Sequence, residues 1–334
     1  MTYMALEPAG APAEESASAP RRTYLRVPER RPTSRLRLGL NLLASAVLVP
    51  WYWSLAAIRS GPGLRYRARC IRLGIQLMLL SRDRDSAVRA LRLILMPMDS
   101  TRYLEFEYAE RMTTPLPTRR YLDVSSPRLV PVLLALERRE LSVMMINPDV
   151  RDLEETRALL TAAGLATRCE TRGSRIADAT LDAGSFDLIT CISVLEHIPD
   201  DTGALAGMQA MLRSGGTLVL TVPCMSQALE QFIDEDEYGL LPQDNDGFVF
   251  WQRYYDARSL RERVYSILGQ PDCLEVYGEK RAGSFARNAE QKRRLGPAYP
   301  FWREPYMMAT EYRRFASIEE LPGEGVACMT FVRK

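Results

Sequence analysis

Beginning near residue 118, short runs of apolar residues alternate with longer stretches that have the apolar spacing of amphipathic helices. The short runs predict seven strands, at 118–124, 141–147, 165–170, 186–192, 217–222, 274–279 and 326–333. The longer stretches predict helices at 127–139, 152–164 and 203–216. Such alternation is typical of a mostly parallel sheet with helices on both faces. We therefore expect an α/β domain over residues 113–334, with ligands bound at the carboxyl ends of its strands.

The apolar pattern of the N-terminal third is different, because its runs are longer. Residues 38–58 carry no charge over 21 positions, a length that suits a membrane-spanning helix. The aromatic residues at 51–53 are of the types found at membrane interfaces, whereas Asn41 and Pro50 oppose a spanning helix. This run therefore predicts either a membrane-associated helix or a buried helix of a cap.

Two shorter apolar runs follow, at 70–81 and 87–98, and arginines interrupt both. We expect residues 36–112 to form a helical region that either caps the main domain or contacts a membrane surface through residues 36–98. Its last part, 98–112, could close over a ligand with the side chains of Arg102, Tyr103 and Glu105, or could simply be an amphipathic linking helix.

Residues 1–35 are rich in Ala, Pro, Glu, Ser and Arg, and they predict a disordered tail without a secretory signal. The charge is uneven: the first 100 residues contain 16 arginines and 7 acidic residues, although the whole chain has a net charge of +2. The small net charge argues against a general nucleic-acid binder. The basic N-terminal third is either a solvated region or a surface that meets an anionic partner or a membrane.

Cysteine and histidine usage excludes several kinds of site. The six cysteines are scattered without a CxxC pair, which argues against a disulfide framework and a zinc site and fits a reducing, cytoplasmic environment. The single histidine, His197, excludes metal sites built on several histidines. We expect no metal site, because the acidic run at 234–237 is more simply a hydrated loop.

Two sequence stretches carry a family likeness: GSFDLITCISVLEHIPDD at 184–201 and LRSGGTLVLTVP at 212–223. Together with the order of strands and helices over residues 118–223, they resemble the class I S-adenosylmethionine-dependent methyltransferases, especially the type 11 group. The resemblance implies a Rossmann-like fold, S-adenosyl-L-methionine as the cofactor and transfer of a methyl group.

The resemblance also implies site residues. Asp123 would organise the cofactor loop, Asn147 would hold the ribose, and Asp178 and Ala179 would contact the adenine. Ser193 and Leu195 would lie under the cofactor, and Glu196 and His197 would face the transfer site. Methyl transfer is a direct displacement that depends on alignment, and an oxygen or nitrogen acceptor can also need a general base. His197 is the candidate base; the alternative is a hydrogen bond in the pocket wall.

The cofactor loop departs from the family pattern. The three glycines of the family are replaced by Ser125, Pro127 and Leu129, and an asparagine stands where an acidic residue holds the ribose. Ser125 and Ser126 followed by proline can start a helix without glycine, and Pro131 is tolerated if that helix begins near residue 129. Pro127 removes a backbone donor that a pyrophosphate would need, which counts against a dinucleotide oxidoreductase but less against a methyl donor that has no phosphate.

The segment 224–256 mixes acidic and aromatic residues between the fifth strand and the next element, and we interpret it as a lid and substrate wall, with a solvated loop as the alternative. The sequence thus predicts a methyltransferase that acts on a small-molecule, saccharide-like or lipid-linked acceptor and is cytoplasmic or membrane-associated. The alternative is a catalytically inactive binding module with the same fold.

Overall fold

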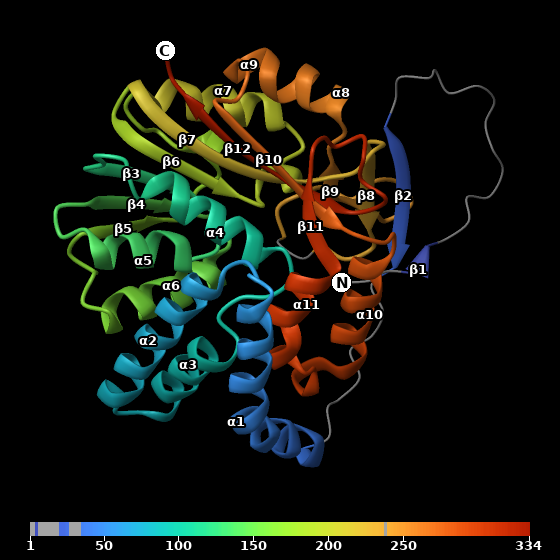
Figure 1. Cartoon of the computed structure of the whole chain (residues 1–334). Helices are drawn as coiled ribbons and strands as arrows, with labels where there is room; N and C mark the ends of the chain where they lie inside the picture. Colours follow the sequence, from blue (N-terminus) through green and yellow to red (C-terminus); the bar gives the residue numbers. More distant parts are fainter. Residues whose placement is uncertain (1–3, 6–19, 27–34, 237–238) are drawn as a thin grey trace.

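The computed structural model describes residues 4–5, 20–26, 35–236 and 239–334, and its centre is a sheet of eight strands (Figure 1). The order across this sheet is β11-β10-β12-β7-β6-β3-β4-β5. Strands β7, β6, β3, β4 and β5 are parallel, whereas β12, β10 and β11 join through antiparallel pairs. The Rossmann-like, mostly parallel sheet is therefore confirmed, with eight strands instead of the predicted seven.

The strand bounds agree with the apolar runs in most places. The strands are β3 (Arg120–Val124), β4 (Ser142–Ile146), β5 (Cys169–Arg172), β6 (Phe186–Ile192), β7 (Leu212–Cys224), β10 (Cys273–Glu279), β11 (Tyr312–Phe315) and β12 (Gly325–Val332). The strand that the sequence missed is β11, which has four residues and is exposed at its two central arginines.

The helix predicted at 203–216 ends earlier, because α7 spans Asp201–Met211 and the next residues join β7. Leu212 pairs with Phe186 of β6, so the strand starts directly after the helix. Gly215 takes a left-handed φ of 73° within this stretch, and its N–H donates to the carbonyl of Arg333. The LRSGG motif is thus extended backbone and not the end of a helix.

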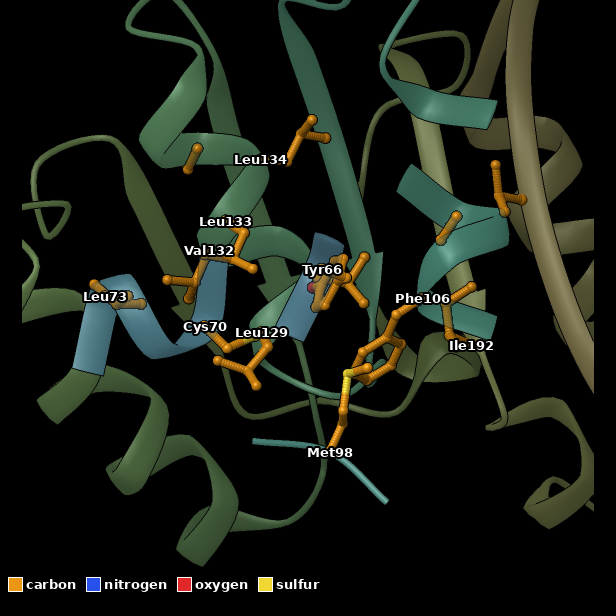
Figure 2. Close-up of a cluster of buried hydrophobic side chains, with 14 of the residues drawn as sticks. Tyr66, Cys70, Leu73, Met98, Phe106, Leu129, Val132, Leu133, Leu134 and Ile192 are labelled. Atoms are coloured by element: carbon orange, nitrogen blue, oxygen red, sulfur yellow. The ribbon is translucent and has the colours of Figure 1, made fainter. Parts of the chain in front are cut away.

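Helices cover both faces of the sheet. On one face lie α4 (Arg102–Thr113), α5 (Leu129–Glu137) and α6 (Val150–Ala162), and on the other lie α7 and the helical segment 257–268. Figure 2 shows the first core, where Phe106 of α4 and Leu129, Val132 and Leu133 of α5 gather with Tyr66 of α2 (Leu64–Leu80). As expected, α5 begins at Leu129, which places Pro131 in the first turn, where its missing N–H costs no helical hydrogen bond.

A second sheet of four strands corrects the predicted N-terminal tail. Its order is β1 (Met4–Ala5), β2 (Arg21–Arg26), β8 (Leu229–Ile233) and β9 (Val249–Tyr254). The prediction of disorder over 1–35 is wrong for residues 21–26, while most of the remaining tail lies outside the described residues. The reason is packing: β2 pairs in parallel with β8, the Tyr24 ring stacks on Phe232 at 5.2 Å, and Leu25 is buried.

The helical region before the sheet consists of α1 (Arg35–Ile58), α2 (Leu64–Leu80), α3 (Arg84–Leu95) and α4. One side of α1 packs against the C-terminal part of the chain, near α11 (Glu304–Glu311), and α10 (Ser284–Leu295) precedes that part. Asn41 donates to the carbonyl of Tyr299 at 3.1 Å and accepts from the Trp302 indole at 3.0 Å.

Among the described residues, no single helix is long and apolar enough to span a bilayer. The two arms of α1, Gly39–Ser45 and Val47–Ile58, meet at a bend of 50° and reach the required length and composition only when they are taken together.

Candidate functional site

Two cavities lie beside each other at the carboxyl ends of the parallel strands. The first has a volume of about 600 Å³ and the second about 670 Å³. Three residues line both: Arg102 at the start of α4, and Ser193 and His197, which follow β6. A molecule in each cavity would therefore meet the other at these three side chains.

The loop after β3 forms one wall of the first cavity and shows how a glycine-free sequence makes this turn. Ser125 adopts a left-handed φ of 50°, a conformation that usually favours glycine. Its N–H and its hydroxyl both donate to the carbonyl oxygen of Ile146, at 2.8 and 3.0 Å. The side chain thus fixes the unusual backbone, and Ser125, Ser126 and Pro127 still line the cavity.

Asp123 supports this loop from below and does not line either cavity. Its buried carboxylate accepts hydrogen bonds from the Thr190 hydroxyl at 2.6 Å and the Tyr121 hydroxyl at 3.2 Å. The Ser126 hydroxyl in turn accepts from the N–H of Ile192 at 3.1 Å. Burial raises the pKa of Asp123 to about 7, against the lowering effect of these donors. Asp123 therefore links β3, β6 and the loop, and its role in organising a cofactor site stays a prediction.

Asn147, the predicted ribose contact, lines the first cavity, but its polar atoms are already engaged. Its Oδ1 accepts from the N–H of Asp149 at 2.9 Å, and its Nδ2 donates to Asp152 Oδ2 at 2.9 Å. Asp152, in the first turn of α6, also lines the cavity and pairs with Arg128. Sequence reasoning missed Asp152, although an aspartate five residues after the strand-end asparagine was a readable signal. The wall thus supplies a carboxylate held in place by the amide of Asn147.

The predicted adenine and under-cofactor residues divide into two groups. Ile176, Ala177 and Asp178 form a 3-10 turn along the first cavity, and Asp178 pairs with Arg175 at 2.8 Å. Ala179 and Leu195 do not line either cavity, because both pack into the core on the α7 face of the sheet. Leu240 and Leu241, from the segment predicted as a lid, also line the first cavity.

The second cavity is enclosed mainly by elements outside the parallel sheet. Its lining includes Leu25 of β2, Gln231 of β8, Trp251, Gln252 and Tyr254 of β9, Phe285, Ala286 and Ala289 of α10, and Gly325 and Val326 of β12. The segment 224–256 therefore contributes strands to a wall, as the interpretation as a substrate wall requires. The contributions of β2 and α10 were not predicted.

Three residues with carboxyl groups, Glu196, Glu324 and Asp99, line the second cavity. Glu196 is 3% exposed, and its Oε2 makes no hydrogen bond with any described residue. Burial raises the pKa of Glu196 to about 8. Glu324 accepts from the Tyr254 hydroxyl at 3.0 Å, and burial raises its pKa to about 7. Asp99 also lines this cavity but pairs with Lys292 at 2.8 Å.

Arg102 is the one cationic residue among the described residues that line the second cavity, and its charge is balanced by the buried carboxylate of Glu105. Its guanidinium donates to Glu105 Oε2 at 3.0 Å. Glu105 is fully buried and also accepts from the Thr221 hydroxyl at 2.6 Å and from the Ser193 hydroxyl. Of the three residues predicted to close over the cofactor from α4, only Arg102 lines a cavity; Tyr103 is buried beneath it and receives a hydrogen bond from Arg67.

His197 sits where the cavities meet, with a defined tautomer. Its Nδ1 lies 2.6 Å from the carbonyl oxygen of Trp251. Because a carbonyl can only accept, Nδ1 carries the proton and Nε2 keeps its lone pair in the neutral ring. Nε2 lies 3.9 Å from Glu196 Oε1. Burial lowers the pKa of His197 to about 4, so the ring is neutral at physiological pH.

Among the described residues, no group of three or more histidine, cysteine or acidic side chains is arranged to hold a metal ion. The acidic run that begins at Asp234 lies partly outside the described residues.

Comparison with known proteins gives one family match. Residues 128–220 match the family model described as a methyltransferase domain, of the type 11 group. This match confirms the resemblance to S-adenosylmethionine-dependent methyltransferases over that segment.

Short stretches of the chain also match curated proteins. One is the ubiquinone biosynthesis O-methyltransferase of Xanthomonas axonopodis pv. citri, 44% identical over 43 residues, which cover 13% of this chain and 18% of that protein. The enzyme of the same name from Xanthomonas oryzae pv. oryzae is 42% identical over 43 residues, with the same coverage. The chain thus spans less than a fifth of the length of these relatives.

Solved structures with a similar arrangement include a geranyl diphosphate methyltransferase in complex with S-adenosylmethionine (TM-score 0.45, 14% identity, covering 76% of this chain and 93% of that one). Another is the geranyl diphosphate C-methyltransferase of Streptomyces coelicolor A3(2) (TM-score 0.42, 10% identity, covering 70% and 85%).

Proposed function

We propose that this protein is an S-adenosylmethionine-dependent methyltransferase whose first cavity holds the methyl donor and whose second cavity holds the acceptor. The observation that carries the proposal is the meeting of the two cavities at Ser193 and His197, inside a segment that matches a methyltransferase domain. Alignment of two reactants across one junction is the main requirement of a direct displacement.

The first cavity fits the donor in shape and charge. When bound, S-adenosylmethionine supplies an electrophilic methyl group on a positively charged sulfonium. Four aspartates line the cavity (Asp149, Asp152, Asp178 and Asp200), against two arginines. The apolar side chains of Ile176, Leu240 and Leu241 would bound the adenine. Asp152 would hold the ribose hydroxyls in place of Asn147, because a carboxylate accepts such hydrogen bonds more strongly than an amide.

The second cavity favours a neutral or cationic acceptor. Burial already opposes ionisation of its carboxyl groups, Glu196 and Glu324, and a phosphate or carboxylate placed beside them would oppose it further, whereas a cation would favour it. Trp251 and Tyr254 offer aromatic surface, which suits a sugar ring or another compact polar molecule. We therefore favour a small polar acceptor that bears a hydroxyl or an amine.

Glu196 is the proposed proton acceptor at the junction. Its Oε2 is free of hydrogen bonds within the described residues, and its carboxyl lines the acceptor cavity. In the ionised form, it can take the proton of the acceptor's O–H or N–H as the nucleophile attacks. A nearby positive charge in the donor cavity favours this ionised form. His197 Nε2 would accept a hydrogen bond from the acceptor and orient it, since a neutral ring with a lowered pKa is a weak base.

The experiment that tests the proposal is calorimetric titration of S-adenosylmethionine into the purified protein and into Asp152→Ala, Asn147→Ala and Asp178→Ala. We expect micromolar binding that Asp152→Ala weakens most. Asp272→Ala, in a carboxylate remote from both cavities that accepts from the N–H of Val332, is the matched control. A folded protein that binds no donor at millimolar concentration would instead support a binding module that has lost the cofactor with its glycine loop.

A further inference from the structure

Among the described side chains of helix α1, those on one side are buried against the body of the protein and those on the other side are exposed. The inward face carries Ser45, at 2% exposure, and Ala56, at 0%, together with Asn41 and its hydrogen bonds to the segment before α11. Tyr52 on the same face packs against the ring of Trp302 at 5.0 Å. These contacts fix α1 lengthwise on the body of the protein.

The outward face of α1 is a continuous stripe of large apolar side chains. Its members are Leu36, Leu40, Leu43, Val47, Trp51 and Ile58, and each is between 58% and 81% exposed. Most are spaced three or four residues apart, which places them on one side of a helix. The stripe turns by 50° between Leu43 and Val47, where the two arms of α1 meet, and its six large side chains form a larger apolar patch than the scattered exposed leucines of an ordinary surface.

The end of α2 extends the apolar surface. Leu79 and Leu80 are 81% and 70% exposed at the turn between α2 and α3. Figure 1 shows that this turn and the N-terminal end of α1 lie on the same side of the molecule, away from the central sheet. Two separate elements on that side of the molecule therefore carry exposed apolar side chains.

The charge around this surface is strongly positive. Exposed arginines of the helical region are Arg59, Arg65, Arg72, Arg82, Arg84 and Arg92, whereas the only acidic residues between positions 36 and 98 are Asp83 and Asp85. A second copy of the chain placed on this face would bring two arginine-rich surfaces together. An anionic surface would instead be attracted by each arginine.

We propose that this face, defined by the outward side of α1 and the end of α2, docks the protein on the surface of an anionic phospholipid bilayer. The helix lies in the plane of the interface with its outward apolar side chains among the acyl chains and the arginines at the headgroups. It does not cross the bilayer, because its inward face holds the polar contacts of Asn41 and the packing of Tyr52. The inference is independent of the proposed methyl transfer.

The test is vesicle flotation of the full-length protein. Vesicles of phosphatidylcholine alone are compared with vesicles containing phosphatidylcholine and phosphatidylglycerol, at low and high salt. One variant replaces Leu40, Leu43 and Val47 with serine. Its matched control replaces Leu136, Val150 and Leu274 with serine; these are exposed apolar residues elsewhere on the surface. A second variant combines Arg65→Gln, Arg72→Gln and Arg82→Gln. Its matched control combines Arg139→Gln, Arg261→Gln and Arg281→Gln.

We expect the wild type to float with the anionic vesicles only, and high salt to reduce this flotation. The serine variant and the glutamine variant should each reduce flotation at least tenfold, whereas their matched controls should not. Circular dichroism melting of every variant checks that it folds. Absence of flotation by the folded wild type would overturn the proposal. Equal losses of flotation in the control variants would also overturn it, as would retention on vesicles after washing with alkaline carbonate. A third contrary result is self-association that the serine variant abolishes, without any lipid binding. Donor titration on the same samples separates failure here from failure of the proposed activity.

Discussion

The Nδ1 atom of His197 donates a hydrogen bond to the backbone carbonyl of Trp251, 2.6 Å away, and this contact ties the end of β6 to β9 of the second sheet. Nδ1 therefore has a structural role, whereas Nε2 lies 3.9 Å from Glu196 Oε1, and the residue lines both cavities. The two roles can be separated, because asparagine places an N–H near the Nδ1 position but has nothing at the Nε2 position.

We predict that His197→Asn keeps the stability of the wild type to within about 1 kcal/mol but lowers turnover. His197→Ala should lose both stability and turnover, since it removes both nitrogens. Thermal melting and methyl-transfer assays on the two variants provide the measurement. Full activity in the asparagine variant would show that Nε2 has no part in the reaction.

For Glu196→Gln we predict a loss in turnover of about 10²–10⁴-fold, the usual contribution of a positioned proton acceptor. Donor affinity should be unchanged, because Glu196 lines the acceptor cavity and not the donor cavity. Glu324→Gln, which alters a carboxyl in the same cavity, is the comparison variant and should affect acceptor affinity more than turnover. A glutamine variant that turns over at the wild-type rate would remove Glu196 from the mechanism.

The buried carboxyls also predict how stability depends on pH. Burial raises the pKa of Glu196 to about 8 and that of Asp123 to about 7, so the folded state holds their protons more tightly than the unfolded chain does. Stability from these groups is complete below about pH 4, the ordinary range of carboxyl groups, and is lost as the pH rises through the folded-state values.

Glu196→Gln cannot lose a proton, so its melting temperature relative to wild type should rise between pH 5 and pH 8, by a few degrees. Melting curves of both proteins over that range give the answer. A difference that stays constant with pH would mean that Glu196 is ionised throughout and that solvent or an ion reaches it.

Leu25 and Ile233 form a matched pair for the wall of the acceptor cavity. Both are buried in the same small core of the second sheet, but only Leu25 lines the cavity. Substitution of either by alanine should destabilise the protein by about 2–4 kcal/mol. Only Leu25→Ala should raise the KM for the acceptor, with the affinity for the donor unaffected. Equal KM values in the two variants would place the acceptor elsewhere.

Ser125 allows a test of the glycine-free loop. Ser125→Gly removes a left-handed serine but also its hydroxyl contact with Ile146, so we expect a change in stability within about 1 kcal/mol and unchanged donor binding. Ser125→Val places a β-branched residue at the same φ and should cost about 1–3 kcal/mol. Chemical denaturation and donor titration measure both effects. A valine variant as stable as the glycine variant would mean that the loop relaxes freely.

The central sheet was predictable because each of its buried strands is a short apolar run bounded by turn residues. β6 matches its run residue for residue. The strand β11 was missed because it has four residues and exposes two arginines, so it lacks such a run. The walls of the first cavity were also largely predictable, since strand ends fix the positions of Ser125, Asn147 and Ser193, which line it; their part in binding a donor stays a prediction.

The residues that line the second cavity could not be predicted from the sequence, because the strands that carry them pair with distant parts of the chain. β2 has the alternating pattern of a strand in the sequence RTYLR, but it needs β8, some 200 residues later, as its partner. Composition alone assigned it to a disordered tail. Similarly, the capture of the Asn147 side chain by Asp149 and Asp152 depends on local hydrogen bonds that no apolar pattern records.

The pairing of β2 with the distant strand β8 also determines the order in which the two cavities can form during synthesis. The acceptor cavity is bounded by Leu25 near one end of the chain and by Val326 near the other. A nascent chain that has emerged from the ribosome as far as residue 224 contains every strand of the parallel half and most of the residues that line the first cavity. Its acceptor wall cannot exist until β8, β9, α10 and β12 have followed, because pairing of high contact order must wait for its distant partner. A nascent or truncated chain is therefore expected to form the first cavity before the second.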